Sequence, residues 1–225
     1  LQWDFRNEAN STVVVTVVPT FLCPSSASPD RFHTYDDDGK SGDASNTGRT
    51  YVNVRLAVSD YAVNNGVEPG LVTAGLVDPG TSGMLSMLQN VDATHPDNVT
   101  YQAQVLDGLS HTFLVSEIAA RPSRFLSGGR SVANFNTHVE WIGGGWADYD
   151  SGYTTHGFTL DGLKSPGPCH TNCTNDNENY AFHNGGANTL MGDGSVRFIK
   201  TTLPIRIFAR LLTRSGGEVV SADSY

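Results

Sequence analysis

The hydrophobic positions of this chain fall in short runs separated by long polar stretches. Runs at residues 51–58, 71–77, 99–105 and 112–118 are bounded by turn-forming clusters such as NNG, DPGTSG and DGLS. Short apolar runs between Gly, Pro, Asn and Asp are typical of β-strands. The pattern therefore predicts four short strands suited to an antiparallel sheet, with one more strand at 138–142.

The last fifty residues carry the clearest pattern. Runs at 188–191 and 195–199 flank an Asp193-Gly194 turn, which supplies the positive φ of a tight hairpin, and Val196 and Phe198 share one face of the second strand. A helix is predicted next, with Pro204 in its first turn and its end at 216–217, where two glycines stand. Its apolar stripe consists of Leu203, Ile207, Phe208, Leu211 and Leu212.

The rest of the chain is less regular. The apolar stretch 12–23 contains Pro19, so we predict it to be extended, and it is too short to span a bilayer. Residues 25–50 are predicted to be a surface excursion, and roughly 121–175 a loop-rich insertion. We expect one α+β domain over 1–225, mainly an antiparallel β-sheet with long loops and a short C-terminal helix.

Composition and charge narrow the function. Apolar residues make up 38% of the chain and charged residues 16%, and the net charge is −9 with only 14 Lys and Arg. Phosphate backbones and anionic membranes need clustered basic residues, so we predict no nucleic-acid partner and no such membrane surface. The chain also lacks a GxSxG elbow, an HExxH helix, a P-loop and a GxGxxG turn, and we predict that it is not an enzyme. A hydrolase using a carboxylate pair stays the weakest alternative, because such pairs have no fixed spacing.

The three cysteines form a close pair and a single residue. Cys169 and Cys173 lie in a Gly/Pro/Asn loop, where a small disulfide-closed ring is expected in an oxidising compartment. The competing interpretation is a zinc site completed by His170, which lacks the usual second Cys/His pair. Cys23 is either a buried thiol or the partner of a cysteine upstream.

The segment FHNGGANTLMGDGSVRFI places nine residues between His183 and the Asp193-Gly194 dipeptide. This H-x9-DG arrangement resembles the signature of a large bacterial family of prepilin-type proteins, catalogued mainly as a domain of unknown function. FLCPS, SDYAVNNG, DGLSHTFLVSE, CTNDNENYAFH and LLTRSGGEVVSADSY extend the resemblance over the whole chain. The residues that it singles out are His183, Asn188, Asp193, Gly194, Glu117 and Asp107.

The resemblance implies a type IV pilin-like or pseudopilin-like precursor with a leader, one long hydrophobic helix and an α+β head. The pilin helix is absent from this chain, which is expected to be the head alone. The implied localisation is extracytoplasmic, at the cell surface or in an extracellular filament, and the implied partners are other pilin-like subunits. Membrane contact is expected only through the missing helix.

For the signature residues we favour structural roles over catalysis. Asp193 is expected to bond backbone N–H groups of its own turn, and His183 to fix a loop, because a lone His lacks a nucleophile and an orienting group. Glu117 ends an apolar strand and needs a donor if it is buried. Our hypothesis is that it ties the sheet to the C-terminal hairpin through His183, Arg197 or backbone N–H groups.

Two further sites are candidates for ligands. Asp36, Asp38 and Asp43 lie in an acidic loop and are weak calcium candidates, since calcium takes several oxygen ligands, although the EF-hand template fails. An aromatic loop offers a platform for a glycan or peptide, against the alternative of lids over the core. Its residues are Trp141, Trp146, Tyr149 and Tyr153. A surface subunit of a pilus-like assembly is our first hypothesis, and a glycan- or solute-binding module is the alternative.

Overall fold

The computed structural model describes residues 5–27, 32–37, 51–83, 86, 102–132, 144–148, 151–217 and 220–221. The strands are β1 (Phe32–Asp37), β2 (Tyr51–Ala57), β3 (Tyr61–Ala62), β4 (Asn64–Val67), β5 (Phe113–Glu117), β6 (Phe125–Leu126), β7 (Arg130–Ser131), β8 (Tyr153–Thr155), β9 (Gly186–Met191) and β10 (Val196–Lys200). The α-helices are α1 (Ser11–Val14), α2 (Pro69–Thr73) and α3 (Ile205–Leu212). Short 3-10 turns occupy Glu8–Asn10, Pro19–Phe21, Thr81–Gly83, Gln102–Gln104, Leu109–His111 and Ser127–Gly129.

The central sheet has four strands in the order β10-β9-β5-β3, and every neighbouring pair is antiparallel. Two-stranded antiparallel ladders join β1 to β2 and β6 to β7, and a parallel pair joins β4 to β8. The architecture is α+β and mostly antiparallel, as predicted.

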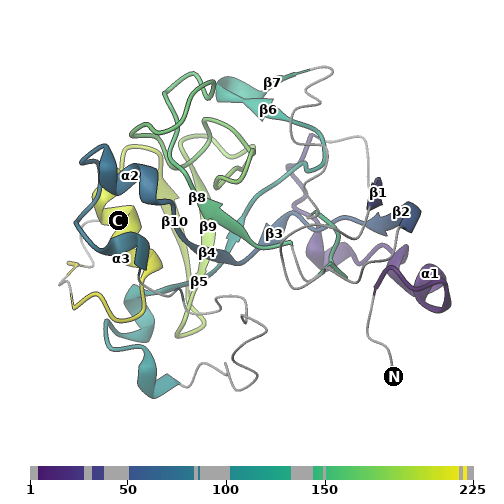
Figure 1. The fold of residues 1–225 in the computed structure, drawn as a ribbon, viewed down its shortest axis with the longest axis horizontal. Coiled ribbons are helices and arrows are strands. Elements are labelled where there is room, and N and C mark those ends of the chain that lie inside the picture. The colour runs from purple at the N-terminus through teal and green to yellow at the C-terminus, as the bar shows by residue number, and fades with distance from the viewer. Residues whose placement is uncertain are drawn as a thin grey trace.

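The main core lies between the sheet and the two helices α2 and α3, which Figure 1 shows together on one side of it. Phe113 of β5 meets Phe208 of α3 edge to face, with ring centroids 5.3 Å apart. Leu71 of α2 and Met191 of β9 are fully buried in the same cluster. A second, smaller core packs α1 against β1 and β2 (Figure 1), at the end of the molecule away from α3.

Several sequence predictions are confirmed. β2 and β5 match the runs at 51–58 and 112–118, and β9 and β10 form the expected hairpin, closed by Gly194 at φ 85°. Helix α3 is also present, but Pro204 precedes it with extended backbone instead of standing in its first turn. Val196 and Phe198 share a face that is 64% and 41% exposed.

Other predictions are wrong. The run 71–77 was expected to be a strand, yet Pro69 starts helix α2 because its fixed φ suits the first helical turn. Within 99–105, the described residues 102–104 form a 3-10 turn. The stretch after residue 11 begins with α1 instead of an extended segment. The strand predicted at 138–142 lies outside the described residues.

The helices of the described segments are all too short or too polar to cross a bilayer. In its described part, the predicted insertion, roughly 121–175, contains the short strands β6, β7 and β8 and the 3-10 turn Ser127–Gly129.

Candidate functional site

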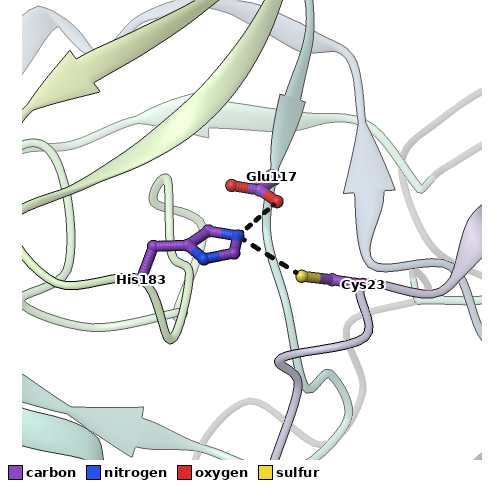
Figure 2. A group of neighbouring side chains, drawn as sticks. All are labelled: Cys23, Glu117 and His183. Carbon is purple, nitrogen blue, oxygen red and sulfur yellow. Dashed lines mark hydrogen bonds and ion pairs between the residues drawn. The ribbon is translucent and has the colours of Figure 1, made fainter.

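Three side chains from distant parts of the chain meet beside the end of β5. Figure 2 shows Cys23, Glu117 and His183 pointing toward one another from three different segments. His183 Nε2 lies 3.2 Å from Glu117 Oε1 and 3.6 Å from Cys23 Sγ. One ligand-type atom from each residue falls within 4.8 Å of the other two. The cluster therefore combines a thiol, a carboxylate and an imidazole in one small volume.

Glu117 is held from two sides. It is the last residue of β5, and its side chain is 1% exposed. Ser116 of β5 pairs with Thr189 of β9, and next to this pair the Glu117 side chain accepts the backbone N–H of Asn188 at 2.5 Å through Oε2. This arrangement leaves Oε1 for His183, and it ties the sheet to the C-terminal hairpin as hypothesised.

Cys23 is positioned by a second buried carboxylate. Asp60 accepts the Cys23 backbone N–H at 2.8 Å and the Ala120 backbone N–H at 2.9 Å. The Asp60 N–H in turn donates to the Phe21 carbonyl. These bonds fasten the segment after the Pro19–Phe21 turn to the residues that follow β5, and they bring the Cys23 thiol to Glu117.

His183 is positioned by the loop that Cys169 and Cys173 close. These cysteines form a disulfide, and Asn172 inside the ring donates through Nδ2 to the carbonyls of His183 and Gly186. Asn172 Oδ1 also accepts the Ala181 N–H at 2.8 Å. The Asn172 side chain thus holds the backbone of the segment before β9, and this fixes the backbone position of His183.

Burial and negative neighbours set the electrostatics of the cluster. Burial, together with the nearby Glu117 and Asp60 carboxylates, raises the pKa of the Cys23 thiol. Burial and the same negative groups raise the pKa of Tyr61 to about 12. The protein alone therefore keeps the thiol and the phenol in their neutral forms.

The geometry does not match a cysteine-protease type of relay. In such a relay one imidazole nitrogen faces the thiol and the other faces the orienting carboxylate. Here Nε2 faces both Cys23 and Glu117. A proton taken from the thiol would occupy the atom that already faces the carboxylate.

His183 also reaches solvent. Its side chain is 29% exposed and lines a cavity of about 700 Å³, together with residues of the disulfide loop, Phe182 and Leu160. Cys23 and Glu117 lie behind it with 1% exposed each. His183 is thus the member of the cluster that borders this cavity.

Another buried carboxylate, Glu178, has a different environment. Its Oε1 accepts the backbone N–H groups of His156 and Gly157 at 2.6 and 2.7 Å. Its Oε2 is buried and has no hydrogen-bond partner within the described part of the chain. Burial raises the pKa of Glu178 well above its usual value, so the neutral acid is favoured.

The other signature residues bond within the fold. Asp193 accepts the N–H and the hydroxyl of Ser195 through Oδ1, which lowers the pKa of Asp193, and Gly194 provides the turn. Asp107 accepts the N–H groups of Gly216 and Gly217 at 2.7 Å each, and so fastens the segment after α3.

The predicted aromatic platform is not supported where it is described. Tyr153 is 2% exposed, and its hydroxyl donates to Asn179 Oδ1 in the core, so Tyr153 cannot face a ligand. Trp146 is half-buried and donates through Nε1 to the Thr16 carbonyl. Trp141 and Tyr149 lie outside the described residues, so the rest of the platform stays a prediction.

The calcium prediction falls mostly outside the described residues, because Asp38 and Asp43 are not among them. Asp36 is described, and its Oδ1 accepts the Asn53 backbone N–H at 2.8 Å.

The zinc interpretation of the cysteine pair is wrong. Cys169 and Cys173 are joined to each other, and His170 is buried with its ring stacked on Phe208 and its Nε2 at 2.7 Å from the Leu203 carbonyl. Burial lowers the pKa of His170 to about 4. The association of Cys23 with Glu117 and His183 was missed, since no spacing in the sequence links them.

The fold and the site together define the class of this protein. It is an α+β protein in which clusters of polar side chains join distant segments of the chain. Among protein families, the one described as "Protein of unknown function (DUF1559)" matches residues 2–206. The chain belongs to this family. No curated protein and no solved structure gives a significant match.

Proposed function

We propose that this chain is the non-enzymatic head of a pilin-like surface protein and works as a structural subunit of an extracytoplasmic assembly. Other pilin-like subunits would be its partners. The proposal rests on the resemblance of the H-x9-DG segment to prepilin-type proteins, and on what the residues of that segment do in the fold.

The observation that carries the proposal is the use of the signature side chains as internal fasteners. Glu117 and Asp107 accept backbone N–H groups from segments far away in the chain, and Asp193 accepts the N–H of its own turn. Bonds of this kind hold a scaffold together and leave few polar groups of the signature for a substrate. The disulfide fits an oxidising, extracytoplasmic location.

Strand β10 offers a surface for contact between subunits. It lies at the edge of the described sheet, and Val196 and Phe198 are 64% and 41% exposed on one of its faces. Exposed apolar side chains on an edge strand favour association with another chain. We therefore place the subunit contact of the proposed assembly on β10.

The test uses the full-length protein on bacterial cells, labelled with an antibody against this domain and viewed by electron microscopy. We expect label on filaments or in surface clusters, and a shorter mature protein only where prepilin peptidase is active. The single change Val196→Asp should disperse the label, because it places a charge in the proposed contact. Val52→Asp is the matched control, since Val52 is a strand valine that is 66% exposed on β2, outside the four-stranded sheet that contains β10.

Two results would overturn the proposal. One is label confined to the cytoplasm, and the other is a dispersed, unprocessed protein whose distribution does not respond to Val196→Asp.

A further inference from the structure

We propose that Cys23, Glu117 and His183 form a zinc-binding site. This inference goes beyond the proposed surface role and does not depend on it, because it concerns the described chain by itself.

The chemistry of the three donors selects the metal. A thiolate, an imidazole and a carboxylate are the ligand types that Zn²⁺ takes in proteins. Calcium and magnesium require oxygen ligands, and two of the three donors here are sulfur and nitrogen. The mixed set points to a borderline divalent ion of the zinc type.

The distances fit a tetrahedral ion. Zinc bonds of about 2.3 Å to sulfur and about 2.0 Å to nitrogen and oxygen, set at tetrahedral angles, separate the ligand atoms by roughly 3.6 Å (S to N) and 3.3 Å (N to O). Cys23 Sγ and His183 Nε2 are 3.6 Å apart, and His183 Nε2 and Glu117 Oε1 are 3.2 Å apart. All three atoms lie within 4.8 Å of one another. The edges that the structure defines are thus close to those of a zinc site.

The ligands are held in place by contacts outside the cluster. Asn188 donates its N–H to Glu117 Oε2, Asp60 accepts the N–H of Cys23, and Asn172 supports the His183 backbone. Hydrogen bonds that fix ligands in this way reduce the ordering cost of metal binding and raise affinity.

One ligand of the proposed site borders a cavity that solvent can reach. The partly exposed His183 borders the cavity described above, whereas Cys23 and Glu117 are buried. Zinc held by three protein ligands keeps its fourth position for water or another small ligand. The ion would also join segments that are separated by 160 and 66 positions in the chain, and so it would stabilise the fold.

The experiment is a titration of the purified, metal-stripped chain with ZnCl₂, in the presence of a mild reductant that keeps Cys23 as a thiol. We expect one zinc per chain by elemental analysis and a higher melting temperature with zinc. Cobalt(II) chloride in place of zinc should give a sulfur-to-cobalt charge-transfer band and the intense visible bands of a tetrahedral site.

Variants assign the ligands. Cys23→Ser, Glu117→Gln and His183→Gln should each weaken zinc binding by about a hundredfold or more, and Cys23→Ser should also remove the charge-transfer band. The matched control is His156→Gln. His156 is 26% exposed and lies 3.7 Å from Glu68, so it matches His183 in its own exposure and in having a carboxylate nearby. Its partner Glu68 is 42% exposed, and the free thiol of Cys23 lies beside His183 instead.

Three outcomes would overturn the site: no uptake of zinc or cobalt by the folded wild-type chain, binding that survives Cys23→Ser, or equal loss in His156→Gln. If Glu117→Gln does not fold, the Cys23→Ser variant still decides the question, because a Ser side chain fits the volume of the thiol. Circular dichroism of each variant without metal establishes that it is folded.

Discussion

Glu117 and Glu178 are both about 1% exposed, yet their surroundings differ. Glu117 lies against the His183 imidazole and an Asn188 backbone N–H, so both of its oxygens have partners. Glu178 accepts two backbone N–H groups on one oxygen, and within the described part of the chain its other oxygen has no hydrogen-bond partner. The pair shows that two equally buried carboxylates can have different sets of partners, so burial alone does not fix the role of a carboxylate.

The two carboxylates also use their partners differently. Glu117 joins three segments and completes a set of metal-type ligands. Glu178 closes the turn after β8 through the N–H groups of His156 and Gly157, and burial favours its neutral form. Glu117 is therefore suited to binding a metal ion, whereas Glu178 acts as a hydrogen-bond acceptor within the fold.

The largest effect is expected from removing the disulfide, because its loop carries Asn172 and leads into Glu178. Replacing both Cys169 and Cys173 by Ser should lower the free energy of unfolding by about 3 kcal/mol, from lost chain restraint and two buried hydroxyls. Urea denaturation measures the loss. Backbone hydrogen exchange should become faster near His183 as well as near Glu178. Unchanged protection at His183 would show that the position of Asn172 does not depend on the disulfide.

Glu117→Gln should cost about 2 kcal/mol at neutral pH, since it removes charge-assisted bonds to His183 and to the Asn188 N–H. The same denaturation experiment measures it, without added metal. An unchanged midpoint would contradict the role of Glu117 in tying the sheet to the hairpin.

Glu178→Gln should raise the free energy of unfolding at neutral pH, whereas Glu117→Gln should lower it. The folded pKa of Glu178 is raised, so its contribution to stability is fully present below the unfolded pKa of 4.5 and is lost as pH rises toward the folded value. The Gln variant lacks this loss and should gain on the wild type by at most about 1.4 kcal/mol per pH unit above that point. Unfolding at a series of pH values from 4 to 7 tests the slope, and parallel profiles would refute it.

The smallest effects are expected at the two partly exposed histidines. His183→Gln should cost about 1 kcal/mol, because its partner Glu117 is buried, whereas His156→Gln should change stability by less than about 0.5 kcal/mol at an exposed pair. Thermal unfolding in metal-free buffer compares them. Equal losses would remove the distinction between the two pairs.

Local patterns in the sequence predicted the parts of the fold that depend on neighbouring residues. The hairpin of β9 and β10 follows from an Asp-Gly turn between alternating strands, and α3 follows from its apolar stripe. The strand predicted at 71–77 is wrong, because Pro69 and the packing of Leu71 into the main core favour a helix there. Short apolar runs satisfy both helix and strand, and only packing decides between them.

The candidate site was predictable only in part. Glu117 and His183 were singled out from the sequence, and their contact was one of the possibilities considered. Tyr153 was expected at a surface platform, yet it is a core residue, since an aromatic ring between glycines carries no signal of burial. The sequence suggested that Cys23 is either a buried thiol or the partner of a cysteine upstream. No pattern in the sequence predicted that it lies beside His183.

The sequence by itself determined the α+β class, the C-terminal hairpin and helix, and the disulfide as the favoured interpretation of the close cysteine pair, because these depend on residues that are neighbours in the chain. Only the tertiary structure decided that Cys23, Glu117 and His183 meet. Their contacts span 160 and 66 positions, and such distances are closed by burial of the sheet and by the bonds of Asp60 and Asn172, not by local conformational preference. The physical reason is that spacing along the chain limits local geometry, whereas long-range contacts follow from how the whole core packs.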